Sequence, residues 1–137
     1  MYVIGILMDP IESINFKIDS SISLIHSLQN KVIIKLIIPD SIYTLSNSVH
    51  AKVCDFYIDS INKNKYKLGR KKNINLNQLD CILFRKDPPV DHHYLAIVQI
   101  LKELEFQNTL VLNSPDSLIR FNEKLLGYQL SNPKIPT

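Results

Sequence analysis

Residues 81–89 read Cys81-Ile82-Leu83-Phe84-Arg85-Lys86-Asp87-Pro88-Pro89, an apolar run that ends in charged residues and two prolines. A continuous apolar segment of this length predicts a strand that is buried on both faces, and the prolines end both a helix and a sheet ladder. In open α/β sheets, ligands bind beyond the carboxyl ends of the strands, where helix N-termini also point. The stretch therefore predicts a central strand that presents charged groups at a ligand-binding edge. An alternative interpretation of Arg85 and Asp87 is a solvated ion pair that only ends the strand.

Strand and helix patterns alternate on both sides of this stretch and predict the rest of the fold. Apolar runs predict strands at 2–8, 31–38 and 109–112, and helical spacing or capping residues predict helices at 20–30, 92–106 and 114–126. The patchy alternation over 42–61 predicts hairpin strands at a sheet edge. Together these elements predict an α/β fold: a mostly parallel, Rossmann-like sheet with helices on both faces and an edge hairpin excursion.

The formal net charge of +3 comes from one short basic run. Without that run the chain carries 10 positive against 13 negative charges, so the basicity is local. A nucleic-acid surface would need aromatic stacking or a recognisable motif, and only Tyr66 interrupts the run. We expect a mobile, solvated loop or hairpin tip and no nucleic-acid partner. The run contains Lys63, Lys65, Lys67, Arg70, Lys71 and Lys72.

Cysteine, histidine and apolar patterns exclude several classes of site. Cys54 and Cys81 lie in separate apolar segments without metal-ligand spacing, which indicates buried thiols in a reducing cytosol and a cytoplasmic protein. The histidines show neither a nucleophile partner nor metal-ligand spacing, so we expect no metal site among them. No apolar run is long enough to span a bilayer, and we expect no membrane partner.

Polar residues around the expected strand ends are suited to holding a small zwitterion. Arg85 can bind a carboxylate, Asp9 or Asp87 can bind an ammonium group, and Ser13, Asn15 and Asn113 can add neutral hydrogen bonds. Three strand ends, at Asp9, Arg85 and Asn113, should meet at one sheet edge. None of these residues is typical of a nucleophile or a tuned acid, so no catalytic residue is assigned.

Three motifs occur in order along almost the whole chain. They are Met8-Asp9-Pro10-Ile11 with Ile14-Asn15 and Lys17-x-Asp19-Ser20, then Arg85-Lys86-Asp87-Pro88-Pro89, then Leu112-Asn113-x-Pro115-x-Ser117-Leu118 with Asn122-Glu123-Lys124-Leu125. Together they resemble the amino-terminal domain of bacterial glutathione synthetase, a family of the ATP-grasp type.

The resemblance implies a function for the constellation. Members of that family join γ-glutamylcysteine to glycine through an acyl phosphate made from ATP with Mg²⁺, and they form oligomers. The loop after the first strand and the Arg-Lys-Asp-Pro-Pro turn form the peptide-substrate side of the site in the family, and Lys124 matches a lysine near the nucleotide phosphates. The fold implied is a pre-ATP-grasp domain over residues 1–125, with 126–137 as the start of a linker to an ATP-grasp domain.

The same resemblance raises an expectation about activity. Enzymes of the family are more than twice as long, so we expect a truncated amino-terminal domain that is inactive alone. An alternative is a non-enzymatic binding or assembly module that pairs with a separate ATP-grasp partner. A second alternative is a flavodoxin-like receiver, because Asp9 and Asp87 both follow strands, but the prolines after Asp87 do not fit a phosphorylated loop.

Overall fold

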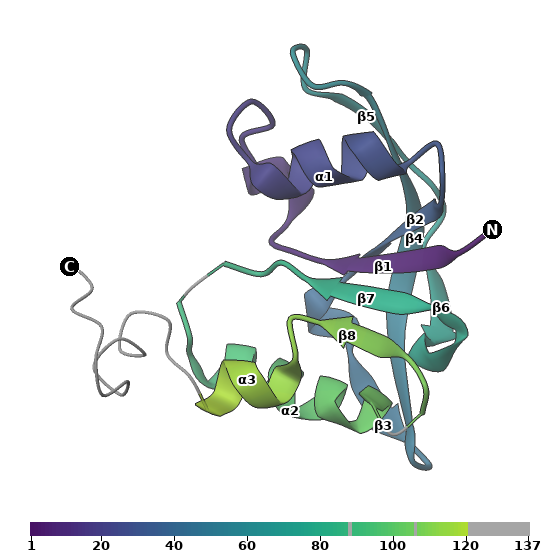
Figure 1. The fold of residues 1–137 in the computed structure, drawn as a ribbon, viewed down its shortest axis with the longest axis vertical. Helices are drawn as coiled ribbons and strands as arrows, with labels where there is room; N and C mark the ends of the chain where they lie inside the picture. The colour runs from purple at the N-terminus through teal and green to yellow at the C-terminus, as the bar shows by residue number, and fades with distance from the viewer. Residues whose placement is uncertain (88, 106, 121–137) are drawn as a thin grey trace, which may run out of the picture.

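The computed structural model describes residues 1–87, 89–105 and 107–120, and its central strand is β1 (Val3–Leu7). β1 pairs in parallel with β2 (Ile33–Ile37) on one side and with β7 (Cys81–Phe84) on the other, and β7 pairs in parallel with β8 (Leu110–Leu112). The predicted parallel core is therefore confirmed, and the stretch that begins at Cys81 lies within it (Figure 1).

Antiparallel strands extend the sheet beyond β2. The order is β3-β4-β2-β1-β7-β8, with β5 and β6 also paired to β4. The expected hairpin excursion is thus present, and the basic run contributes to β5, to the connection after it and to the first residue of β6. The bounds are β3 (Tyr43–Leu45), β4 (Ser48–Ser60), β5 (Lys65–Leu68) and β6 (Lys72–Asn75).

Helices cover both faces of the sheet, as predicted. α1 (Ser20–Leu28) lies on one face, and α2 (His92–Glu105) with α3 (Pro115–Arg120) lies on the other (Figure 1). Asp19 caps α1 by accepting hydrogen bonds from the backbone N–H groups two and three residues later. Short 3-10 turns at Ile11–Ser13, Pro39–Ser41 and Leu76–Gln78 complete the elements.

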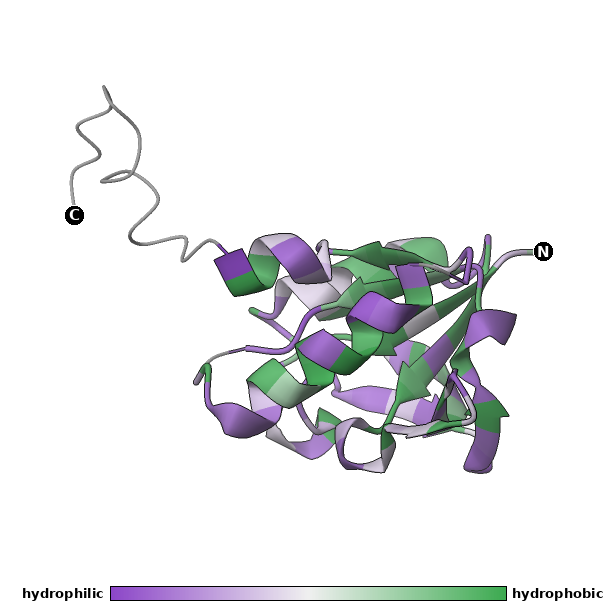
Figure 2. Ribbon diagram, turned by 90° about the horizontal axis from the view of Figure 1, so that it is seen from below, coloured by the Kyte–Doolittle hydropathy of each residue, from purple (hydrophilic) through white to green (hydrophobic). Residues whose placement is uncertain are grey.

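Two apolar layers form the interior, one on each face of the sheet. The layer under α1 includes Phe16, Ile22 and Ile25, and the layer under α2 includes Leu101 and Leu104. In Figure 2, hydrophobic segments are concentrated on the central strands and on the turns of the helices that cover them. Burial of these side chains is the main stabilising contribution to the fold.

Strand β4 contributes to both layers. Val49, Ala51 and Val53 are buried on the α2 side, whereas Cys54 and Phe56, with Ile58 after them, are buried on the α1 side. Neighbouring residues of a strand point to opposite faces, so the strand needs no break to change the face it buries. This crossing explains why the sequence alternation over 42–61 is patchy.

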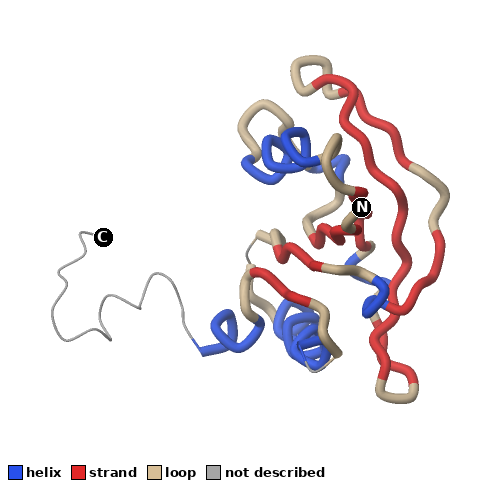
Figure 3. Tube along the Cα trace, turned by 45° about the vertical axis from the view of Figure 1, so that its right-hand side comes forward, coloured by secondary structure: helices blue, strands red, loops and turns tan. Residues whose placement is uncertain are grey.

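The basic run lies on the hairpin that follows β4. Its tip carries Asn64, whose φ of 50° is left-handed, and its β5 strand pairs with β4 around a register shift near Ser60. Figure 3 shows this tip at the same end of the molecule as the loop before α1. The hairpin is present, but of the basic run only Lys63 lies at its tip; Lys65 and Lys67 belong to β5 and Lys72 begins β6.

Candidate functional site

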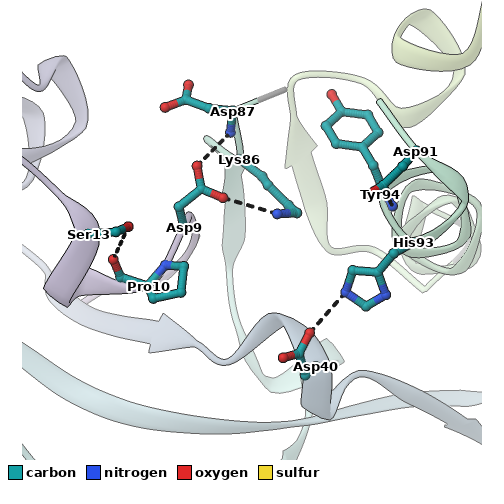
Figure 4. A network of polar contacts seen from close by, with 9 residues as sticks. All are labelled: Asp9, Pro10, Ser13, Asp40, Lys86, Asp87, Asp91, His93 and Tyr94. Atoms are coloured by element: carbon teal, nitrogen blue, oxygen red, sulfur yellow. Dashed lines mark hydrogen bonds and ion pairs between the residues drawn. The ribbon is translucent and has the colours of Figure 1, made fainter. Parts of the chain in front are cut away.

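The carboxyl ends of β1 and β7 are tied together at one edge of the sheet. The backbone N–H of Arg85 donates to the carbonyl oxygen of Leu7 at 2.7 Å, which continues the pairing with β1 one residue past the end of β7. Lys86 Nζ lies 3.0 Å from Asp9 Oδ1, and the backbone N–H of Asp87 donates to Asp9 Oδ2 at 3.3 Å (Figure 4). Both carboxylate oxygens of Asp9 are therefore engaged within the protein.

Lys86 is a site residue that the sequence analysis did not select. Its side chain is 17% exposed and that of Asp9 is 24% exposed, so the ion pair is mostly shielded from water. The available signal was a lysine two residues after the end of one strand and an aspartate two residues after the end of another. Parallel neighbours bring such ends together, and opposite charges there favour pairing.

Arg85 reaches from the end of β7 to the start of α1. Its Nε donates to Ser21 Oγ at 3.0 Å, and its Nη2 donates to Ser20 Oγ at 2.6 Å. Within the described part of the chain it forms no ion pair with Asp87, so the strand-ending ion pair of the alternative interpretation is not what the structure has. The hydroxyls hold the guanidinium at the N-terminus of a helix without neutralising its charge.

Asp87 and Asn113 lie at the same sheet edge with exposed side chains. The carboxylate of Asp87 points away from the Asp9–Lys86 pair in Figure 4. Asn113 follows β8, and β8 is the parallel neighbour of β7, so the predicted meeting of three strand ends is found in the backbone. Neither side chain makes a hydrogen bond within the described ranges, which leaves both available to a ligand.

The N-terminus of α2 forms one rim of this edge. The backbone N–H of Tyr94 donates to Asp91 Oδ1 at 2.8 Å and lowers the pKa of that carboxyl, and the charges of His93 and Lys86 act in the same direction. His93 Nε2 lies 3.0 Å from Asp40 Oδ1, so the turn after β2 is tied to α2 (Figure 4).

Ser13 and Asn15, the other predicted site residues, lie in the loop after β1 and make local hydrogen bonds. Ser13 Oγ donates to the carbonyl oxygen of Pro10 at 2.7 Å, and Asn15 Oδ1 accepts from the backbone N–H of Lys17 at 3.2 Å. Both residues line an open depression of about 590 Å³ between the loop at 13–17 and the hairpin tip at 62–64. The predicted constellation is thus divided between the sheet edge and this depression.

Some expectations fall on parts of the chain outside the described residues. These are the role of Lys124, the domain boundary near 125 and the linker at 126–137. Within residues 1–87, 89–105 and 107–120, no group of three His, Cys, Asp or Glu side chains is arranged to hold a metal ion. None of the described helices combines the length and apolar character needed to cross a membrane.

Comparison with known proteins gives a consistent result. Residues 2–119 match the family described as prokaryotic glutathione synthetase, N-terminal domain. The chain is 36% identical over 123 residues to the glutathione synthetase of Buchnera aphidicola subsp. Baizongia pistaciae, a match that covers 89% of this chain and 38% of that protein. It is 38% identical over 126 residues to the glutathione synthetase of Wigglesworthia glossinidia brevipalpis, and 33% identical over 126 residues to that of Salmonella typhimurium.

The last two matches each cover 91% of this chain and 40% of the relative. The chain therefore spans about two fifths of the length of the curated relatives that it matches.

Proposed function

The chain belongs to the family of prokaryotic glutathione synthetase N-terminal domains, and from this premise we propose that it is the peptide-recognising domain of an ATP-dependent ligase that joins γ-glutamylcysteine to glycine. One observation carries the proposal. Arg85 is held at the ligand-binding edge by two serine hydroxyls, so it keeps its full positive charge in a fixed position.

The polar groups at the sheet edge match the two ends of a γ-glutamyl group. A guanidinium binds a carboxylate with two parallel hydrogen bonds where its geometry allows, and Arg85 Nη1 forms no hydrogen bond within the described ranges. The exposed carboxylate of Asp87 suits the ammonium group of the substrate, and Asn113 suits a neutral hydrogen bond.

In this proposal Asp9 acts indirectly. Its two oxygens hold the ammonium of Lys86 and the backbone of Asp87, so it orients the turn that carries the binding groups. The loop residues Ser13 and Asn15 would contact the substrate only if its other end extends beyond the strand ends toward the depression.

ATP and Mg²⁺ are implied by the family, and the described residues do not fit them. Gly5 is packed against core side chains and Gly69 against the backbone of Asp55, so neither glycine forms a loop that could cradle phosphates. The described residues also lack a cluster of metal-ligating side chains. We therefore assign nucleotide binding to residues outside the described ranges, with Lys124 among them, and derive no step of phosphoryl transfer here.

We further propose that residues 1–125 act as the substrate domain, that 126–137 begin the linker to an ATP-grasp domain, and that the ligase works in the cytoplasm. We also propose that this ligase forms homo-oligomers. The 137-residue chain alone should form no glutathione, because phosphoryl transfer depends on positioned phosphates and metal. Synthesis of glutathione by the purified chain from ATP, γ-glutamylcysteine and glycine would show that this part of the proposal is wrong.

Calorimetric titration with γ-glutamylcysteine tests the recognition step. The chain should release heat on binding the peptide with or without MgATP, and Arg85→Ala should abolish it. Arg70→Ala is the matched control, because Arg70 is an exposed arginine of the basic run away from the sheet edge, and it should leave binding unchanged. Peptide binding by the Arg85→Ala variant would contradict recognition by this domain. The same conclusion would follow if the unsubstituted chain bound no peptide either with or without MgATP.

A further inference from the structure

The depression beside the hairpin tip has walls from two segments that are far apart in the sequence. One wall is the loop at 13–17 that precedes α1, and the other is the tip at 62–64 between β4 and β5. Figure 3 shows that the two segments lie at the same end of the molecule. The depression is separate from the sheet edge at Arg85, and the proposed recognition of peptide there does not use its lysines.

Aromatic packing fixes the distance between the two walls. Phe16 is 1% exposed, and its ring stacks on that of Tyr66 in β5 with centroids 5.5 Å apart. The ring of Tyr66 in turn lies 5.8 Å from that of Phe56 in β4. Since Phe16 belongs to the loop and Tyr66 to the hairpin, one aromatic cluster holds both walls, and the depression is preorganised.

The backbone of both walls is also fixed. Asn15 accepts the backbone N–H groups of Lys17, Ile18 and Asp19, which closes the loop into a turn before α1. At the tip, the backbone N–H of Lys63 donates to Ser60 Oγ at 3.3 Å, and that of Asn64 donates to the carbonyl oxygen of Ile61 at 3.2 Å. These bonds position the side chains that face the depression.

The charged side chains that line the depression are all positive. Lys17 and Lys63 contribute ammonium groups, and the other polar groups that line it are serine and asparagine side chains; no acidic side chain is among them. Within the described part of the chain, neither lysine forms an ion pair. By contrast, Lys67 on the same hairpin pairs with Asp59 at 3.3 Å.

We propose that this depression binds a small oxyanion that carries two negative groups, with Lys17 and Lys63 each facing one of them. The asparagine amides of the tip supply neutral N–H donors, which suit carboxylate or phosphate oxygens equally. Two cations on opposite walls favour a ligand with separated charges over a single small ion. The chemistry assigned is thus that of a dicarboxylate or a diphosphate.

The test follows the backbone amide NMR signals of the chain during titration with pyrophosphate. Signals of residues 13–17 and 62–64 should shift in a saturable way, and Lys17→Gln and Lys63→Gln should each weaken binding by about tenfold. The matched control is Lys67→Gln, which removes the same charge from the same hairpin but from outside the depression, and it should change binding by less than about twofold.

A parallel titration with succinate distinguishes the two sources of the anion. Tighter binding of pyrophosphate identifies phosphate as the ligand group, and tighter binding of succinate identifies carboxylates. Binding is read from the signals of residues 13–17 and 62–64 and not from those of the sheet edge, so failure of peptide recognition at that edge remains distinguishable from failure of this site. Absence of saturable shifts with both probes, or equal weakening by Lys67→Gln and Lys63→Gln, would overturn the proposal.

Discussion

Lys86 and Asp9 form a 3.0 Å ion pair that joins the segments following β7 and β1, and both side chains are less than one quarter exposed. The pair holds the Arg-Lys-Asp turn against the first loop of the chain. Its contribution should exceed that of a surface ion pair, because water screens it only partly.

Removing this cation should destabilise the fold. We expect Lys86→Met to lower the free energy of unfolding by about 1–2 kcal/mol, because Asp9 then keeps a shielded carboxylate with only a backbone partner. Urea denaturation at neutral pH measures the effect. Lys67→Met is the control, because the Lys67 side chain is 75% exposed in its ion pair with Asp59. This substitution should lower the free energy of unfolding by less than about 1 kcal/mol. Equal losses in the two variants would contradict a special role for Lys86.

Gly5 should not tolerate a methyl group at the centre of β1. A Cβ atom there would meet Leu79 Cδ1 at 2.6 Å and Ile37 Cδ1 at 2.8 Å, and both neighbours are buried. Gly5→Ala should therefore lower the unfolding free energy by about 1–3 kcal/mol. Leu79→Val shortens one colliding side chain, so in a double-mutant cycle it should cost less in the Gly5→Ala background than in the wild type. Strict additivity would show that the predicted collision does not occur.

The cap of α2 should make stability depend on pH in the acidic range. The Tyr94 N–H lowers the pKa of Asp91 below its ordinary value of 3.8. The Asp91 carboxylate therefore binds a proton more readily in the unfolded chain than in the folded one. Its contribution to folding stability is fully present at pH values above its ordinary pKa, and it is lost as the pH falls through the folded-state pKa.

Asp91→Asn isolates this effect, because asparagine also caps helices but does not titrate. The wild type should lose stability relative to Asp91→Asn between pH 5 and about pH 2, as measured by thermal unfolding at several pH values. A difference between the two proteins that is constant with pH would contradict the assignment.

The two cysteines should react slowly and in a defined order. Burial raises the pKa of both thiols, and Cys54 is 3% exposed whereas Cys81 is only partly buried. Iodoacetamide at pH 8 should label both more slowly than free cysteine, and Cys81 before Cys54. Mass spectrometry of Cys54→Ala and Cys81→Ala follows each thiol alone, and urea should remove the difference. Earlier labelling of Cys54 would contradict the burial described.

Most of the fold could be predicted because its signals are local. The strand that begins at Cys81, the helix over 92–105 and the cap at Asp19 each depend on residues within one short segment. The prediction that Cys81 is a buried thiol was only partly correct, because Cys81 and Leu83 share the face of β7 on which neither side chain is fully buried.

The candidate site could be predicted only where topology alone determines it. Parallel pairing brings Asp9, Arg85 and Asn113 to one edge, as the order of the strand patterns predicts. The contact of Arg85 with Ser20 and Ser21 could not be predicted, because it depends on where α1 crosses the sheet. The separation of Ser13 and Asn15 from the edge likewise depends on Phe16 packing against a hairpin about fifty residues later.

β4 has a consequence for how the molecule comes apart. Val53 is buried in the layer beneath α2 and its neighbour Cys54 in the layer beneath α1, so one uninterrupted backbone belongs to both. Because both layers contain β4, neither layer can unfold while the other still holds this strand. We therefore expect both layers to unfold in a single cooperative step. The amide protons in the middle of β4 should then exchange with solvent deuterium only when the whole domain opens, and more slowly than those of the short edge strand β8.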